Sequence, residues 1–435
     1  MKRYARRTVD RTPFAQSDDR LETRYGLPRE VRFCRRCVIS NQRPNSAIEY
    51  AHSATTRKST IHFENGICDA CRAAELKVKI EWTERERELR ELFDRYRRND
   101  GGYDCLVPGS GGKDSFYISH VLKYRYGMHP LTVTWAPHIY TDWGWRNFQK
   151  WIGSGFDNTL HTPNSRVHRL LTRLAVEVLF HPFQPFIIGQ KALAPRLSVL
   201  HGIRLVFYGE NEAEYGNPIA DVGLATRNEE YFTREHKHLF LSGVPIDELI
   251  SDFGLDENSL IPYLPADPDA MRKVGTEVHY LGYYLKWHPQ SCYYYAVEHG
   301  GFEASPERTP GTYSKYNSID DRVDDIHYYT TYIKFGIGRA TYDAAQEVRS
   351  GDITRDEALA LVRRYDGEFP ERFIDELFRY LSLPESEFPE ASRHFEQPIM
   401  DRKYFMELAD RFRSPHLWRR EDGEWRLRHT VWQGN

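Results

Sequence analysis

A short glycine-rich segment restricts the fold more than any other feature of the sequence. The segment PGSGGKDS, residues 108–115, follows an apolar stretch at 103–108 and leads into a run with helical spacing at 115–126. Further apolar stretches alternate with helical patterns and lie at 131–135, 159–162 and 203–208. Strands that alternate with helices are typical of a parallel sheet with helices on both faces. The sequence therefore predicts an α/β fold whose ligand site lies at the carboxyl ends of the strands.

The glycine-rich segment also has the chemistry of an anion site. It matches neither the ordinary phosphate loop GxxxxGK[ST] nor the dinucleotide pattern GxGxxG. Its glycines allow backbone N–H groups at a helix N-terminus to approach an anion closely. Lys113 adds a positive charge, Ser110 and Ser115 add hydroxyl groups, and Asp114 either caps the helix or holds a metal ion.

Two CxxC pairs predict a metal site near the N-terminus. The pairs are Cys34 with Cys37 and Cys68 with Cys71. Four thiolates complete a closed tetrahedral site for structural zinc, which leaves no open position for catalysis. The 30 residues between the pairs exceed the usual spacing of about 15–20, so we expect an inserted polar loop. An iron–sulfur cluster and redox chemistry remain as alternatives to zinc.

The length and composition indicate a globular protein with more than one part. The 435 residues are 40% hydrophobic and 28% charged, and no apolar run reaches the roughly 18 residues of a membrane span. The N-terminus has no apolar run of a secretory signal, so we expect a soluble, cytoplasmic protein. The expected parts are a basic arm (1–30), a zinc-binding module (31–80), a connecting helix (81–101), the α/β domain (102–300) and a mostly helical region for substrate or partner contacts (301–435).

The charge is unevenly distributed along the chain. Residues 1–100 carry 23 Lys and Arg against 16 Asp and Glu, whereas the whole chain has a net charge of −3. A basic front end either contacts a polyanion such as nucleic acid or is simply a solvated charged surface. Charge alone does not distinguish these two interpretations.

The glycine-rich segment resembles a known nucleotide loop. Residues 110–115 are similar to the SGGxDS loop of the PP-loop ATP pyrophosphatases, which split ATP between the α and β phosphates and adenylate a carbonyl oxygen. The resemblance implies that Lys113, Asp114 and Ser115 are catalytic. It further implies ATP contacts from Pro108, Ser110, Gly111, Gly112, Lys113, Asp114, Ser115, Trp135, Gly209, Glu210 and Asn211, and magnesium contacts from Asp114 and Glu212.

A wider resemblance covers residues 30–370. The CxxC pairs, the motif PGSGGKDS, the motif YGEN at 208–211, and the motifs GIGRATYDA and ITRDEALALVRRYDG at 336–367 occur in that order. Together they resemble the N-acetyl sugar amidotransferases of bacterial surface-polysaccharide and nonulosonic acid biosynthesis. That family activates the acetamido carbonyl of a sugar with ATP and replaces its oxygen with ammonia. The resemblance implies an acetamidino sugar as product, with release of AMP and pyrophosphate.

Candidate substrate contacts follow in the C-terminal third. A polar loop at 313–321 contains Lys315, which would reach a phosphate, and Asp320 and Asp321, which would bind magnesium or accept a proton from ammonia. The two aspartates also suit the N-terminus of the next helix. Lys334 and Arg339 flank a flexible Gly-Ile-Gly turn, as a site for an anionic sugar would require. A plain surface turn is the alternative.

The source of ammonia lies outside this sequence. Neither a cysteine directly after Met1 nor a GxCxG elbow is present, so the chain has no recognisable glutaminase of its own. The resemblance implies a separate glutaminase subunit and a cyclase-like barrel protein as partners. We expect no contact with a membrane, and we regard nucleic acid as an unlikely partner.

A different activity for the same loop is tRNA thiolation. Some PP-loop thiolases also carry an N-terminal cysteine module, and the basic front end fits RNA. However, only Cys105 and Cys292 remain as sulfur carriers. Cys105 lies in a predicted buried strand, and neither residue belongs to a recognisable persulfide motif.

Overall fold

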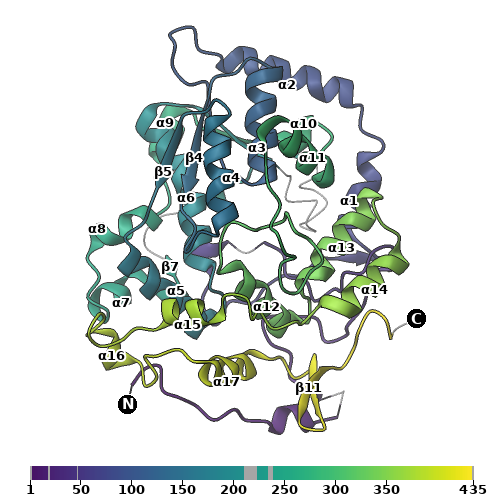
Figure 1. Ribbon diagram of the computed structural model, residues 1–435, viewed down its shortest axis with the longest axis vertical. Coiled ribbons are helices and arrows are strands. Elements are labelled where there is room, and N and C mark those ends of the chain that lie inside the picture. The colour runs from purple at the N-terminus through teal and green to yellow at the C-terminus, as the bar shows by residue number, and fades with distance from the viewer. Residues whose placement is uncertain (1, 18–19, 47, 210–222, 234–238, 434–435) are drawn as a thin grey trace.

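A parallel sheet of five strands forms the centre of the protein in the computed structural model (Figure 1), which describes residues 2–17, 20–46, 48–209, 223–233 and 239–433. The strand order is β5-β4-β3-β6-β9, and every neighbouring pair is parallel. The strands are β3 (Cys105–Pro108), β4 (Pro130–Trp135), β5 (Asn158–His161), β6 (Leu205–Tyr208) and β9 (Glu277–Tyr280).

Helices cover both faces of this sheet. Because side chains alternate along a strand, Leu106 and Val206 pack in one apolar cluster while Val107 and Phe207 pack in another. The first cluster includes side chains of α5 (Ser165–Leu179) and α6 (Gln184–His201), and the second those of α2 (Trp82–Tyr96), α3 (Lys113–His120), α10 (Leu281–Tyr284) and α11 (Pro289–Gly300). The predicted α/β class with a parallel sheet between helices is confirmed.

The first helix after the glycine-rich loop begins earlier than the sequence predicts. Gly112 has extended backbone angles and caps α3, so the helix starts at Lys113 rather than at Ser115. It ends at His120 and continues as a π-helical segment, Val121–Arg125. The predicted helix after the cysteine module is α2, which buries Leu89, Leu92, Phe93 and Tyr96.

The direction of the connections places a crevice beside the central strand. From β3 the chain moves outward through β4 to β5, and from β6 it moves the other way to β9. Sheets of this kind bind ligands where adjacent strands send their connections in opposite directions. The glycine-rich loop leaves β3 at this point. Gly209 follows β6, and Glu210, Asn211 and Glu212 lie outside the described residues.

The N-terminal arm packs along the C-terminal region. In Figure 1 the arm runs along the lower edge, below α17 (Arg402–Phe412). Arg6 forms an ion pair with Glu407, and the guanidinium of Arg24 donates hydrogen bonds to the backbone oxygens of Arg411 and Arg413 at 2.7 and 2.9 Å. Part of the basic charge of the arm is therefore satisfied within the chain.

The elements of the N-terminal hundred residues are short. They are η1 (Thr12–Ala15), η3 (Glu49–Ala51), β1 (Phe63–Glu64), β2 (Ile67–Cys68) and α1 (Asp69–Lys77), in addition to α2. Strands β1 and β2 form an antiparallel hairpin that leads directly into α1.

The C-terminal region is mostly helical, as expected, but ends in a hairpin that the sequence did not predict. Its helices are α12 (Asp324–Phe335), α13 (Arg339–Ser350), α14 (Arg355–Tyr365), α15 (Ile374–Leu381), α16 (Ala391–His394) and α17, followed by β10 (Trp418–Glu421) and β11 (Glu424–Leu427). A capping box of Thr354 and Glu357 begins α14.

Helix α4 (Asp142–Gly153) connects β4 to β5. Small elements connect β6 to β9, and those described are η7 (Glu229–Tyr231), β7 (Phe240–Leu241), β8 (Val244–Pro245), α7 (Ile246–Ser251), α8 (Glu257–Leu260), η9 (Ile261–Tyr263) and α9 (Pro268–Val274). Among the described residues, no helix has the length and apolar character needed to span a bilayer.

Candidate functional site

The glycine-rich loop is held in a fixed shape by its own residues. Gly111 has a φ of +86°, and a Cβ atom added there would lie 2.6 Å from the Cα atom of Phe148. Both facts require glycine at this position. The hydroxyl of Ser115 donates to the backbone oxygen of Gly112 at 2.8 Å and accepts from the N–H of Gly111 at 3.1 Å. Ser115 therefore ties the loop together from inside.

The first turn of α3 places a cation and an anion beside the loop. The Nζ atom of Lys113 lies 2.7 and 2.8 Å from the two carboxylate oxygens of Asp114. The Lys113 side chain is nearly buried, while that of Asp114 is more exposed. Both residues line a cavity at the helix N-terminus, where the helix dipole and free N–H groups favour an anion.

This cavity, of about 490 Å³, is the main candidate site. Its walls come from the cysteine module, the glycine-rich loop, α4, the 316–320 loop, α12 and α13. The charged residues that line it are Arg43, Lys113, Arg339 and Arg349 on the positive side and Asp114, Asp320 and Asp343 on the negative side. Its size is that of a small-molecule site, and its mixed charge suits a polar anionic ligand.

Two adjacent aspartates of the 313–321 loop have different positions. Asp320 lines the cavity, and burial raises the pKa of its carboxyl, opposed by a hydrogen bond from Ser110. Asp321 accepts hydrogen bonds from the backbone N–H groups of His138 at 2.7 Å and Val323 at 3.0 Å, and contacts the ring of His138 at 2.7 Å. Only Asp320 of this pair belongs to the cavity lining.

Arg339 is a buried cation with unused hydrogen-bonding capacity. Its guanidinium stacks on the ring of Tyr328 at 3.9 Å and donates to the backbone oxygen of Asn317 at 2.7 Å. An ion pair of 3.6 Å joins its Nε atom to Asp343. Within the described residues, neither Nε nor Nη1 makes a hydrogen bond. The arginine can therefore donate hydrogen bonds to an anionic or hydroxylated ligand in the cavity.

Other predicted site residues lie away from this cavity. Trp135 is buried against His161, with ring centroids 4.7 Å apart, and does not belong to the lining. Lys315 donates to the backbone oxygen of Pro306 at 2.9 Å, on the surface. Lys334 is buried and donates to the backbone oxygen of Leu179 at 2.7 Å. It lines a second cavity of about 210 Å³.

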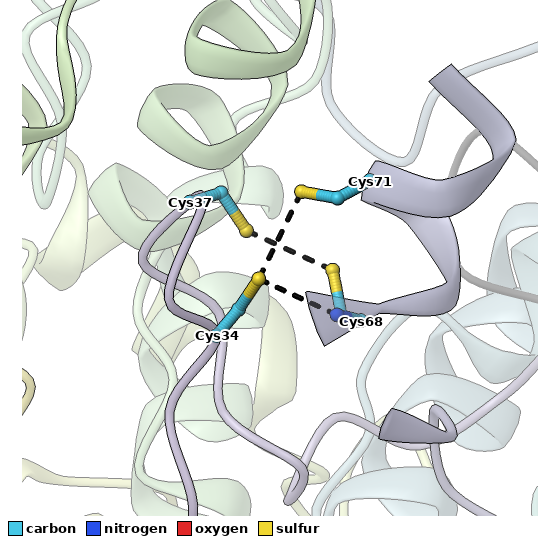
Figure 2. A group of neighbouring side chains, drawn as sticks. All are labelled: Cys34, Cys37, Cys68 and Cys71. Atoms are coloured by element: carbon cyan, nitrogen blue, oxygen red, sulfur yellow. Dashed lines mark hydrogen bonds between the residues drawn. The ribbon is translucent and has the colours of Figure 1, made fainter. Parts of the chain in front are cut away.

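The four cysteines of the CxxC pairs meet in one buried cluster. Figure 2 shows their sulfur atoms pointing toward one another, two from a loop, one from β2 and one from α1. The Sγ atoms of Cys34 and Cys71 lie 3.9 Å apart, and those of Cys37 and Cys68 lie 3.8 Å apart. With zinc–sulfur bonds of about 2.3 Å, the edge of a tetrahedron is about 3.8 Å. The cluster therefore fits zinc.

A second group of metal-type side chains was not expected from the sequence. The ligand atoms of Glu49, His52 and His181 all lie within 4.8 Å of one another. Burial lowers the pKa of His52 to about 4 and also lowers that of His181. Burial opposes ionisation of Glu49, yet hydrogen bonds from both histidines keep the pKa of Glu49 well below its usual value.

Sequence reasoning also missed several cavity residues. Arg43 comes from the cysteine module and Arg349 from the end of α13, and neither belongs to a pattern that indicates a ligand. Asp343 could have been predicted from the sequence, because it stands in the GIGRATYDA motif four residues after Arg339. On a helix this spacing brings two side chains to one face.

The C-terminal third is similar to a known family of domains. Residues 310–431 match the family model of the C-terminal domain of WbpG-like LPS biosynthesis proteins. The matched region includes α12 and α13, which line the main cavity. The match supports a role in polysaccharide biosynthesis.

A curated relative adds little about activity. Over 82 residues the chain is 29% identical to an uncharacterized protein of Methanocaldococcus jannaschii. The aligned stretch covers 19% of this chain and 29% of the relative, so the chain matches less than a third of that protein.

Proposed function

We propose that this protein is an ATP-dependent, AMP-forming amidotransferase that converts the acetamido group of an N-acetyl sugar to an acetamidino group. The observation that carries the proposal is the composition of the main cavity. A glycine-rich loop suited to phosphates forms one wall, and the region similar to WbpG-like LPS biosynthesis proteins forms another. A reaction between a nucleotide and a sugar requires both kinds of surface in one place.

The loop would bind the phosphates of ATP. Its backbone N–H groups, the N-terminus of α3 and the ammonium of Lys113 place positive charge where pyrophosphate develops negative charge. The carboxylates of Asp114 and Asp320 line the same cavity and provide the oxygen ligands that magnesium prefers. Magnesium bound there would neutralise charge on the leaving pyrophosphate.

The C-terminal helices would bind the sugar. Asn317 and Asp343 offer amide and carboxylate groups for hydroxyls, and Arg339 has free donors for an anionic group. The acetamido oxygen attacks the α-phosphorus of ATP, and pyrophosphate leaves. Ammonia then adds to the activated carbon, AMP leaves with the former acetamido oxygen, and loss of a proton gives the amidine. Asp320, which lines the cavity, would accept that proton when its carboxyl is ionised.

Ammonia would come from partner proteins in the cell. A glutaminase subunit and a cyclase-like barrel protein are the proposed partners, and ammonium salt replaces them in a purified assay. A tRNA-thiolating activity is not favoured, because Cys105 and Cys292, the cysteines outside the cluster, are both buried. Burial also raises the pKa of the Cys105 thiol, which reduces its reactivity.

Product analysis by mass spectrometry tests this proposal. The protein is incubated with ATP, magnesium, ammonium salt and a panel of N-acetylated nucleotide sugars, and AMP release is followed in parallel. We expect one sugar to become lighter by the difference between oxygen and NH, with one AMP formed for each product. AMP release that responds to bulk tRNA but to no sugar would contradict the proposal and favour thiolation.

A matched pair of lysine variants gives this assay its control. Lys113→Met removes the cation at the cavity and should reduce turnover by roughly 10²–10³-fold. Lys273→Met removes an exposed lysine at the end of α9, outside the cavity lining, and should leave turnover unchanged. Equal rates for the two variants would exclude a catalytic role for Lys113.

A further inference from the structure

The second cavity has a cluster of metal-type ligands at its wall that the amidotransferase proposal does not use. Glu49 and His181 line this cavity of about 210 Å³, and His52 lies beside them. The Nδ1 atom of His52 is 3.1 Å from one carboxylate oxygen of Glu49, and the Nε2 atom of His181 is 3.8 Å from the other. In tetrahedral zinc sites with bonds of about 2.0–2.1 Å, ligand atoms lie about 3.4 Å apart.

Local structure positions all three side chains. The single turn η3 presents Glu49 and His52 together, because the N–H of His52 bonds to the backbone oxygen of Glu49 at 3.0 Å. His181 follows α5, and Phe180, the residue that caps this helix, has the left-handed conformation at a φ of 48°. Phe180 is fully buried and stacks on Phe412, with ring centroids 5.0 Å apart. The direction of His181 is thus set by packing.

The side chains of Gln184 and His327 border the cluster. The amide of buried Gln184 donates to the backbone oxygen of Glu49 at 3.2 Å and accepts from the N–H of Ser242 at 2.7 Å. The ring of His327 stacks on that of His181 at 5.1 Å, and its Nδ1 atom has no hydrogen-bond partner within the described part of the chain. An unpartnered buried ring nitrogen beside the cluster is consistent with a ligand or an ordered water at this position.

We propose that Glu49, His52 and His181 bind a second divalent metal ion of the zinc class, with one coordination position open toward the second cavity. Two imidazoles and one carboxylate are the donor set of zinc sites that keep a position free for water or substrate. The cluster differs in this respect from the four cysteines, which form a closed site. The proposal does not depend on the amidotransferase activity.

Two lysines near the cluster allow a prediction about metal affinity. Lys58 and Lys334 line the same cavity; burial lowers the pKa of each ammonium, and the negative charge of Glu49 opposes that shift. A positive charge near a bound cation weakens its binding. The metal affinity should therefore increase when Lys58 is replaced by methionine, which keeps the length of the side chain.

Metal counting on the full-length protein tests the site. The chain is saturated with Zn²⁺, freed of excess ion and analysed for metal content. We expect two ions for each chain in the wild type and one in His181→Asn. The variant His279→Gln is the control, because His279 also bonds a glutamate, Glu277, at 2.9 Å, yet its other ring nitrogen contacts the Tyr284 hydroxyl instead of a second histidine. This variant should retain two ions.

Cobalt substitution separates the two sites and reports on folding. Cobalt in the cysteine cluster gives strong sulfur charge-transfer bands, whereas cobalt bound by nitrogen and oxygen gives only weaker visible bands. We expect His181→Asn to lose the weak bands and keep the strong ones, and Lys58→Met to show a smaller Kd for the weak-band site. A wild-type protein that binds only one ion, a second ion that persists in His181→Asn, or a Kd that Lys58→Met does not lower would overturn the assignment.

Discussion

Adjacent side chains in the 313–321 loop serve different purposes because the backbone turns them toward different surroundings. Asp320 points into the main cavity, where burial favours its neutral form. The carboxylate of Asp321 accepts hydrogen bonds from backbone N–H groups of the segment after β4 and contacts the ring of His138. The sequence presents the two residues as equivalent carboxylates, and only the cavity distinguishes them.

Substitution of these two aspartates should have opposite effects on stability. Asp321→Ala leaves three backbone N–H groups, one buried and two partly buried, without this acceptor and should lower the free energy of unfolding by about 3 kcal/mol. Asp320→Asn should raise that free energy near neutral pH, because the wild-type carboxyl must ionise in a half-buried position that raises its pKa. Urea unfolding of both variants measures the difference.

The pKa shift of Asp320 determines how the stability difference between wild type and Asp320→Asn changes with pH. Its pKa is raised in the folded protein, so the folded state holds the proton more tightly, and this contribution to stability is present at low pH and lost as the pH rises through the folded pKa. The advantage of Asp320→Asn over wild type should therefore be small near pH 4 and larger near pH 8. An advantage that shrinks as the pH rises would contradict the burial of this carboxyl.

At the scale of elements, the turn from β3 into α3 forms one wall of the main cavity and is the proposed anion site. The loop needs backbone N–H groups at the helix N-terminus and a close approach to α4, which passes beside Gly111. The hydroxyl of Ser115 fixes the loop from within. The sequence pattern indicated this turn, since glycines and an apolar strand occur within a dozen residues, but Gly112 rather than Asp114 caps the helix.

The two central glycines should respond differently to alanine. Gly111→Ala combines a positive φ with contact against the backbone of Phe148, and we expect it to lower the unfolding free energy by at least about 2 kcal/mol. Gly112 has an ordinary φ, and a Cβ atom there would meet only the Ser110 hydroxyl at 3.7 Å. Gly112→Ala should cost about 1 kcal/mol or less, as a helix cap. Thermal unfolding of the pair checks this order, and equal losses would argue against the loop geometry.

At the scale of the whole molecule, the cysteine module is a wall of the main cavity as well as the home of the buried four-cysteine cluster that fits zinc. Ile39, Ile61 and Ala70 of the module line the cavity. Arg43 contacts the ring of Tyr342 at 5.4 Å, and Arg355 of α14 donates to the backbone oxygen of Cys37 at 3.3 Å. The cysteine module therefore supports the position of side chains that line the main cavity.

Loss of the cysteine-bound metal should consequently affect both stability and the main cavity. Cys71→Ser should reduce the metal content and lower the thermal midpoint by roughly 5–10 °C. It should also weaken ATP binding measured by calorimetry. Cys292→Ser is the control, because Cys292 is buried in α11 outside the cluster, and it should retain the metal. Unchanged ATP affinity after complete metal loss would show that the module does not shape the cavity.

The sequence by itself determined the local features of this protein. Alternating apolar stretches specify parallel strands, the two CxxC pairs specify a cysteine cluster, and the glycine-rich segment specifies a tight turn between a strand and a helix. Each of these features depends on residues close together in the chain, so spacing and residue type are sufficient to predict it.

Tertiary structure alone decided which distant groups share a site. It brought Arg43, Lys113, Asp320 and Arg339 to one cavity and left Lys334 in another. It also placed His181 beside Glu49 and His52, more than a hundred residues away in the sequence. Such contacts arise from the packing of whole elements and from the burial of side chains between them. Sequence spacing carries no record of these distances, because the residues concerned meet only after the elements have packed.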